Sequence, residues 1–363
     1  LIAIEAYQSA INANPHNIDN YLKVSRLLIY TGRYGEARVN AENAILLDNK
    51  RAEAYAMLGW AKGFEKNYLE GERDARRAIE LDPNSSLAHA VTAYLLGLRV
   101  EAGLEDLNTI DEAIEESRTA LALNPNSLEV HWARGYVLEI TSNYSDAAEE
   151  YEAAVAINPY ISLLHMALGR NYFTLERLDE AILEFTRANA LNPLNPDANY
   201  YISLVWARNG EYAKAIQYAL EALKTDATDP YLYANVGTLY YRQELYNQSI
   251  PYLELAVRGG VAEDGSVVQG LVLAYNRSII EIYSRYGLAL ARVNRCQEAM
   301  PVANGMLQTI ADDENGKYNA NEILRICQEN LTNPPTPTPT LTPTMISGPT
   351  PTPEGQATPT PTP

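Results

Sequence analysis

The chain has 363 residues and a formal net charge of −18, which comes from 46 acidic and 28 basic residues. A partner with a phosphate backbone needs a concentrated basic face, so we expect no nucleic-acid partner. No run approaches the roughly 18 apolar residues that a membrane helix requires, so we expect no membrane-spanning segment in this sequence.

The chain opens on a pattern that recurs further along. Ala3, Tyr7, Ala10 and Pro15 have the spacing of a second helix in a helix pair. We therefore interpret residues 1–17 as a partial repeat unit, and we expect the sequence to begin inside a repeat.

Alanines then mark a period of 34 residues, broken once by eight extra residues. These alanines are Ala10, Ala44, Ala78, Ala120, Ala154, Ala188, Ala222 and Ala256. A fixed period of this length indicates a repeat architecture. It predicts the units 18–51, 52–85, 86–127, 128–161, 162–195, 196–229 and 230–263, followed by a unit with an insertion, 264–313.

The two central units repeat each other's residue types almost position by position. His131, Gly135, Ala147, Tyr151, Ala154 and Pro159 return 34 residues later as His165, Gly169, Ala181, Phe185, Ala188 and Pro193. Apolar residues between them recur at three- and four-residue steps, which predicts two amphipathic helices per unit. The small residues allow close helix crossings, and the prolines end the second helices.

This pattern resembles the tetratricopeptide repeat family, whose 34-residue unit carries small, aromatic, Ala and Pro positions in this order. The resemblance covers about residues 1–330 and is closest at 51–83 and 128–193. It implies an all-α fold: a right-handed superhelical solenoid of helix-turn-helix repeats over residues 1–332.

Two interruptions follow from the spacing. The eight extra residues fall within 97–108, and the capping-box pair Thr109 and Glu112 predicts that a helix restarts near Ile110. Sixteen extra residues precede Gly287, where we expect one long helix over about 267–292. A capping helix over 317–331 is expected to cover the last apolar face.

The last 31 residues, 333–363, contain 11 Pro and 10 Thr without apolar periodicity. This composition predicts a disordered tail. The tail resembles Thr-Pro stalks of bacterial surface and secreted proteins. We therefore expect a location in the cell envelope or outside the cell, with a cytoplasmic adaptor as the alternative.

Two cysteines bear on the same question. If the capping helix packs as the first helix of a further unit, Cys296 and Cys327 lie at one edge of the stack. We predict a disulfide between them. Two unrelated buried thiols are the alternative interpretation.

Neither a metal site nor a catalytic site is expected. His89, His131 and His165 occupy the same position in consecutive units, and such units step by about 10 Å, too far for a shared metal. Packing and hydrogen bonding are the favoured roles. Motifs of nucleotide-binding loops and hydrolases are absent, so we expect no cofactor and no enzyme activity. Carboxylates such as Glu149, Glu150 and Glu152 are expected on solvated faces without partners.

The resemblance implies that function lies on the concave surface, which is lined by fixed positions of the first helices. In this sequence these positions hold Arg26, Trp60, Phe64, Tyr94, Trp132, Tyr136, Arg170, Phe173, Tyr200, Arg208, Tyr241, Arg242 and Arg292. Aromatic and arginine side chains together are typical of peptide recognition. The alternative is that a chain with 26 tyrosines places aromatic residues at any set of positions.

The family's known groove uses a Lys and Asn clamp for the terminal carboxylate of chaperone tails. Arg26, Trp60 and Tyr94 stand at the corresponding positions here, so we expect an extended ligand with acidic and aromatic side chains instead. We predict a non-enzymatic scaffold that binds a protein or peptide partner, and that Ala at Trp132 and Tyr136 abolishes capture without loss of helicity. The alternative is the substrate-recruiting arm of a larger enzyme, such as a glycosyltransferase, with its catalytic domain elsewhere.

Overall fold

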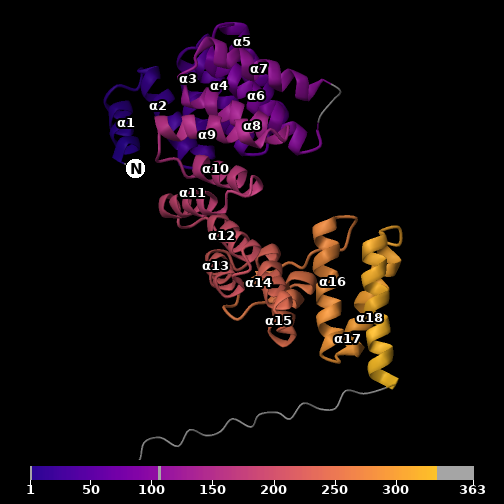
Figure 1. The fold of residues 1–363 in the computed structure, drawn as a ribbon. Helices are drawn as coiled ribbons and strands as arrows, with labels where there is room; N and C mark the ends of the chain where they lie inside the picture. The colour runs from indigo at the N-terminus through magenta and orange to yellow at the C-terminus, as the bar shows by residue number, and fades with distance from the viewer. Residues whose placement is uncertain (1, 105–107, 333–363) are drawn as a thin grey trace, which may run out of the picture.

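The computed structural model describes residues 2–104 and 108–332, which form a stack of helices (Figure 1). Eighteen helices lie in these residues, with two strands of two residues each, so the predicted all-α, right-handed solenoid is confirmed. The expected Thr/Pro tail, 333–363, falls outside the described residues. None of the described helices is both long and apolar enough to cross a bilayer.

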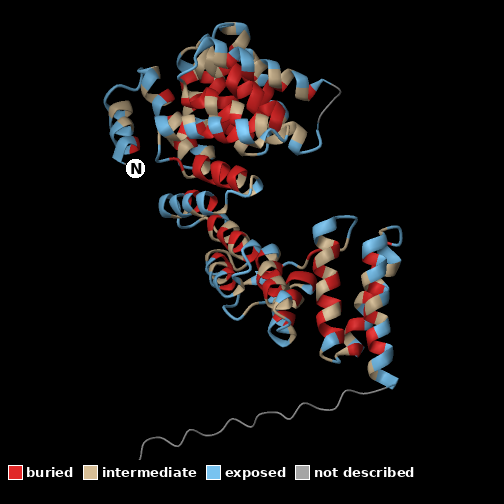
Figure 2. Cartoon of the chain, viewed as in Figure 1, coloured by how far each residue is buried: buried red, intermediate tan, exposed pale blue. Residues whose placement is uncertain are grey.

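Consecutive helices pack together in pairs after the first helix, α1 (Ile2–Ala13). The pairs are α2 (Ile18–Tyr30) with α3 (Tyr34–Leu47), α4 (Ala52–Phe64) with α5 (Tyr68–Leu81), α6 (Ser86–Glu101) with α7 (Thr109–Leu123), α8 (Leu128–Ile140) with α9 (Tyr144–Ile157), α10 (Ser162–Thr174) with α11 (Leu178–Leu191), α12 (Asp197–Arg208) with α13 (Tyr212–Thr225), α14 (Pro230–Arg242) with α15 (Tyr246–Arg258), and α16 (Arg277–Arg292) with α17 (Cys296–Thr309). The last helix, α18 (Glu314–Thr332), packs on both α16 and α17. Buried residues follow the helix faces that meet within this stack (Figure 2).

Glycines stand where two helices of a pair cross, as the spacing predicts. A methyl group added at Gly169 would lie 2.6 Å from the ring of Phe185, which is fully buried. The in-phase alanines from Ala44 to Ala256 are likewise buried. Small side chains are therefore required at these crossings because the helices approach closely.

We expect Gly59→Ala to lower the free energy of unfolding by about 1–3 kcal/mol, the usual cost of overpacking. The new methyl group would lie 2.6 Å from the backbone oxygen of Gly71, which cannot move aside without shifting α5. The measurement is chemical denaturation followed by circular dichroism. Gly305→Ala is the matched control, since no atom lies within 4 Å of its added methyl group. The control should gain stability, by up to about 1 kcal/mol from helix propensity; equal shifts in both variants would contradict the argument.

One position near the start of the first helix ties each unit to the loop before it. In five units its side chain donates a hydrogen bond to the backbone carbonyl six residues earlier: Tyr21 to Pro15, His89 to Pro83, His131 to Pro125, His165 to Pro159, and Tyr233 to Ala227. The loops are thus held by side chains as well as by prolines, which accounts for the uniform stacking step.

The eight-residue interruption lengthens α6 and delays α7. Helix α7 begins at Thr109, one residue before the predicted restart, and α6 continues to Glu101. The Arg99 guanidinium donates to the carbonyl of Leu104 and closes the end of α6. Residues 105–107 of the interruption lie outside the described residues.

The long helix expected over 267–292 is wrong. A short hairpin of β1 (Gly260–Val261) and β2 (Val267–Val268) stands there, and α16 begins only at Arg277. The N–H of Leu271 donates to the α15 carbonyl of Ala256, so the backbone of this segment completes the end of α15. The side chain of Asn276 then accepts from two N–H groups of α16, which is an N-cap at a different place from the one expected.

At the end of the array, α18 packs so that a disulfide joins Cys296 of α17 to Cys327. Their Cα atoms lie 5.4 Å apart. Both residues are buried, and Asn330 donates to the Ala291 carbonyl beside them. This edge of the final three helices is therefore held by a covalent bond and a hydrogen bond.

Candidate functional site

The concave side of the first units is filled by aromatic side chains. The indole rings of Trp60 and Trp132 lie 5.3 Å apart, and those of Tyr94 and Tyr136 lie 4.6 Å apart. Only 3% of Trp132 and 7% of Tyr136 is exposed, and Phe64 packs on both Trp60 and Trp132. These five predicted groove residues come together, but four of them are buried, so the interpretation of Trp60, Tyr94, Trp132 and Tyr136 as an open binding surface is wrong.

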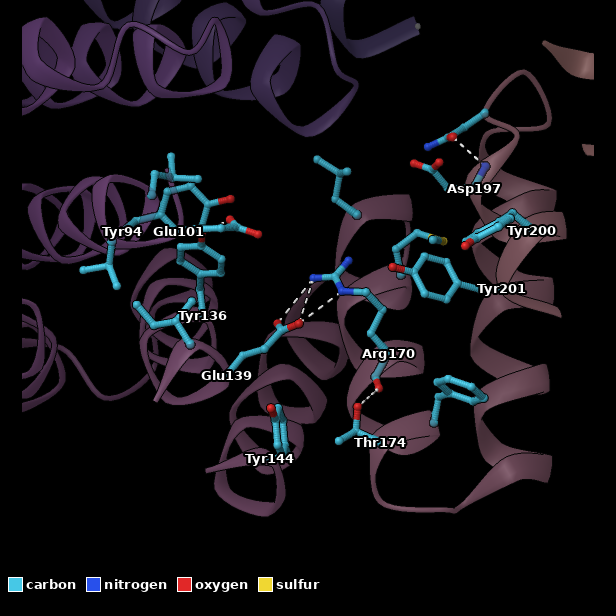
Figure 3. A pocket seen from close by; sticks show the side chains of 17 residues that line it. Tyr94, Glu101, Tyr136, Glu139, Tyr144, Arg170, Thr174, Asp197, Tyr200 and Tyr201 are labelled. Atoms are coloured by element: carbon cyan, nitrogen blue, oxygen red, sulfur yellow. Dashed lines mark hydrogen bonds and ion pairs between the residues drawn. The ribbon is translucent and has the colours of Figure 1, made fainter. Parts of the chain in front are cut away.

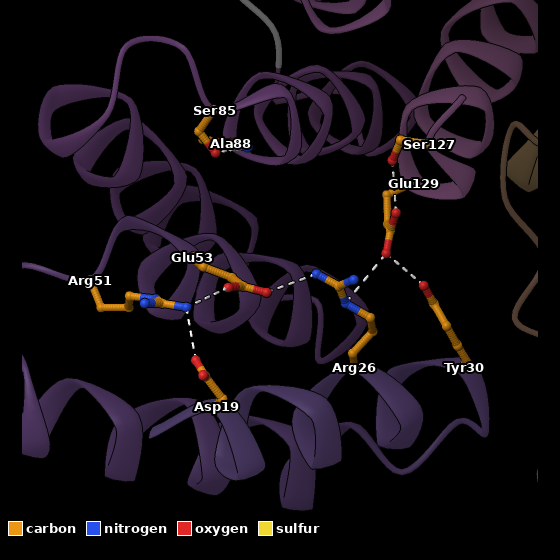
Figure 4. Close-up of polar contacts among 9 residues, drawn as sticks. All are labelled: Asp19, Arg26, Tyr30, Arg51, Glu53, Ser85, Ala88, Ser127 and Glu129. Atoms are coloured by element: carbon orange, nitrogen blue, oxygen red, sulfur yellow. Dashed lines mark hydrogen bonds and ion pairs between the residues drawn. The ribbon is translucent and has the colours of Figure 1, made fainter. Parts of the chain in front are cut away.

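The reason is that the superhelix closes on itself between α2 and α8. The hydroxyl of Tyr30 donates to Glu129, 99 residues away, at 2.6 Å. Arg26 pairs with the same carboxylate at 3.4 Å and with Glu53 at 2.9 Å (Figure 4). The ring of Tyr30 also lies 6.3 Å from that of Trp132. Arg26 therefore holds the first superhelical turn together.

Beyond this closed turn, the concave side opens into a cavity of about 830 Å³ between α6, α8, α10 and α12 (Figure 3). Five of the predicted groove residues line it: Tyr94, Tyr136, Arg170, Phe173 and Tyr200. Other residues of its wall include Glu101, Glu139, Tyr144, Asp197 and Tyr201. This cavity is the candidate site, because it is concave, largely aromatic and built on rigid helices.

An ion pair crosses the middle of the cavity. The guanidinium of Arg170 lies 3.1 Å from the carboxylate of Glu139, which also accepts the hydroxyl of Tyr151. Burial alone would lower the pKa of Arg170, but the charge of Glu139 outweighs it and the pKa is raised. Arg170 is thus permanently charged and already matched by a carboxylate of the same protein.

Tyrosines form the two walls on either side of this pair. On one wall, the Tyr136 hydroxyl donates to Glu101. On the other, the rings of Tyr200 and Tyr201 meet edge to face at 5.4 Å. Burial raises the pKa of Tyr200 and of Tyr201, so both stay neutral at physiological pH. The walls therefore offer uncharged aromatic faces and hydroxyl groups.

The remaining predicted residues lie outside the cavity. Arg208 lies over the ring of Phe173 at 4.3 Å and pairs with Glu176 at 2.8 Å. Tyr241, Arg242 and Arg292 belong to α14 and α16, and the structure does not bring them to this site. The predicted set therefore separates into a buried cluster, a cavity and scattered surface positions.

Sequence reasoning missed the acidic members of the cavity. Glu139 and Asp197 occupy the same inward-facing positions of their units as the aromatic residues that were chosen, so the period could have found them. Glu101 precedes the eight-residue interruption and has no equivalent in the other units. Only the structure places it in the wall.

The three histidines have structural partners. The ring nitrogen that does not bond the loop carbonyl donates to a carboxylate: His89 to Glu116, His131 to Glu150 and His165 to Glu184. Packing and hydrogen bonding, the roles favoured for them, are confirmed. The expectation that carboxylates such as Glu150 and Glu152 lack partners is wrong, because Tyr172 also donates to Glu152.

Both ring nitrogens of His131 and His165 donate to acceptors, which requires the protonated imidazole. The hydrogen bond to Glu150 raises the pKa of His131; burial would lower that of His165, but its bonds to Glu184 and the Pro159 carbonyl raise it. We expect NMR titration midpoints of both rings above 6.5 in the folded protein and near 6.5 in urea. A pKa raised on folding stabilises the fold below pH 6.5, and this contribution is lost as the pH rises through the folded value. Folded midpoints at or below 6.5 would contradict this assignment.

These features define a helical-repeat solenoid with a concave cavity. Residues 52–85, 104–160 and 166–230 match models of the tetratricopeptide repeat. The chain is a tetratricopeptide repeat protein, and proteins of this family are generally non-catalytic scaffolds for protein interactions. No curated protein sequence matches it.

Solved structures show the same fold. The chain is similar to one in the crystal structure of the APC/C hetero-tetramer Cut9–Hcn1, with 17% identity and a TM-score of 0.60. That similarity covers 79% of this chain and 52% of the other, so this chain spans about half of its length. A tetratricopeptide repeat protein from Parabacteroides merdae ATCC 43184 is 14% identical over 77% of this chain and 99% of its own, with a TM-score of 0.48. Pseudomonas aeruginosa pilF is 23% identical over 57% and 91%, with a TM-score of 0.46.

Proposed function

We propose that this chain is a non-enzymatic scaffold that binds an extended peptide segment of a partner protein in the cavity between α6, α8, α10 and α12. The observation that carries the proposal is the cavity itself, whose volume of about 830 Å³ suits several side chains rather than a folded domain. Its walls stand on helices that pack against both neighbours, so the binding groups are held in place before the ligand arrives.

The half-buried aromatic residues of the cavity supply the binding area. Phe173, Tyr200 and Tyr201 line it and remain partly exposed, whereas Trp132 is used within the core. Large rings with partial exposure are the side chains that most often dominate binding at protein interfaces. The binding surface thus lies further along the chain than the positions expected from sequence.

The test is selection of random ten-residue peptides displayed on phage against the folded array. A variant with Phe173→Ala and Tyr200→Ala should bind the selected peptides at least about 30-fold more weakly, the effect of losing about 2 kcal/mol. Its far-UV circular dichroism should match that of the unchanged protein. Tyr160→Ala is the control, because Tyr160 is 79% exposed in a loop away from the cavity. Equal binding to both variants, or no selected peptides, would refute the proposal.

We also propose display in the cell envelope or outside the cell. The Thr/Pro-rich composition of residues 333–363 supports it, and so does the disulfide between Cys296 and Cys327, since such bonds persist in oxidising compartments. Protease treatment of intact cells should remove the array. Complete protection until the cells are lysed would contradict this location.

A further inference from the structure

We propose that the cavity selects a basic side chain, Lys or Arg, in the bound peptide segment. This inference rests on the proposed function and adds the chemistry of the ligand. It replaces the expectation of an acidic ligand, which rested on counting arginines at concave positions.

Those arginines are already matched by carboxylates of the protein. Arg170 pairs with Glu139 inside the cavity, and Arg208 pairs with Glu176 outside it. Arg26 is used in closing the first superhelical turn. An acidic peptide would have to displace an internal carboxylate at each of these positions, which offsets most of the gain from a new ion pair.

The charge left over in the cavity is negative. Four of its wall residues are charged: Glu101, Glu139, Arg170 and Asp197. Arg170 and Glu139 neutralise each other, and within the described residues neither Glu101 nor Asp197 has a cationic partner. The cavity therefore carries two uncompensated carboxylates, which attract a cation entering from solvent.

Both carboxylates are held in the ionised form by their surroundings. Glu101 accepts the hydroxyl proton of Tyr136, as an anionic acceptor does. Asp197 is the first residue of α12, where the positive end of the helix dipole favours a negative charge. They lie on opposite sides of the Arg170–Glu139 pair (Figure 3), so an extended segment crossing the cavity passes both.

Aromatic faces beside each carboxylate suit the same ligand. Tyr94 and Tyr136 stand on the side of Glu101, and Tyr200 and Tyr201 on the side of Asp197 (Figure 3). A Lys or Arg head group over a tyrosine ring gains from the ring quadrupole while its aliphatic stem covers apolar surface. Since the tyrosines stay neutral, they add no charge that would compete with the carboxylates.

The experiment uses four libraries of nine-residue peptides that differ only in a fixed central residue: Arg, Lys, citrulline or Glu, with equal mixtures elsewhere. The amount retained on the immobilised full chain is measured by mass spectrometry. We expect the Arg and Lys libraries to be retained at least about tenfold more than the citrulline and Glu libraries. Citrulline keeps the shape of Arg without its charge, so it separates charge from size.

Two isosteric variants link this selectivity to the site. Glu101→Gln with Asp197→Asn removes both charges and keeps the side-chain volumes, and it should reduce the preference for Arg over citrulline to about twofold or less. Glu149→Gln is the matched control, because Glu149 is exposed on α9 and does not line the cavity. The control should keep the full preference.

The outcomes are distinguishable. Retention of the Glu library at or above that of the Arg library, or a preference that survives in the double variant, overturns the inference of a basic ligand while groove binding stands. Retention of none of the four libraries overturns the proposed function and this inference together. Preference for Arg and Lys that disappears only in the cavity variant supports both.

Discussion

Trp132→Ala is expected to lower the free energy of unfolding by about 3–5 kcal/mol, the usual cost of removing a buried Trp. The indole of Trp132 is 3% exposed and meets the rings of Tyr30, Trp60, Phe64 and Tyr94. Its loss leaves a cavity where α2, α4, α6 and α8 converge. Urea denaturation followed by circular dichroism measures the change.

The effect should also spread along the chain. In most repeat arrays each unit contacts only its neighbours, so damage stays local. Here Trp132 joins units that are far apart in sequence, and we expect hydrogen exchange to quicken in α2 and α4 as well as in α8. Tyr160→Ala, an equally aromatic but exposed position, should change stability by less than about 0.5 kcal/mol. Unchanged exchange in α2 would show that the superhelical closure contributes nothing to stability.

Reducing the disulfide between Cys296 and Cys327 is expected to destabilise the last three helices by about 3–4 kcal/mol in the chain-entropy model. The bond closes a loop with a sequence separation of 31, which limits the freedom of the unfolded end. Hydrogen exchange in α16, α17 and α18 with and without reductant measures the effect. Helices α2 and α4 serve as the internal control and should not respond.

A thiol assay checks the same bond chemically. The denatured protein should release no free thiol without reductant and two with it. Replacing both cysteines by serine should reproduce the loss of protection in α18 and make the protein insensitive to reductant. Equal thiol counts in both conditions would show that the cysteines are not joined in solution.

The sequence by itself determined the helices and their stacking. The 34-residue spacing of Gly, Ala and Pro predicted the crossings at Gly169 and the restart of α7 near Ile110, because these features depend on contacts within one unit or with the next. Such contacts repeat with the period, so a single sequence shows them eight times over. The histidine roles followed from the same phase argument.

Only the tertiary structure decided which concave residues form a surface. Whether Trp132 is a ligand contact or core depends on how tightly the superhelix turns, and that curvature brings Tyr30 to Glu129 across 99 residues. No local pattern records a contact of that range. The segment before α16 failed for a related reason, because its backbone pairs with the end of α15 instead of with itself. Period and propensity describe each helix, whereas the open cavity is set by the sum of small angles between all of them.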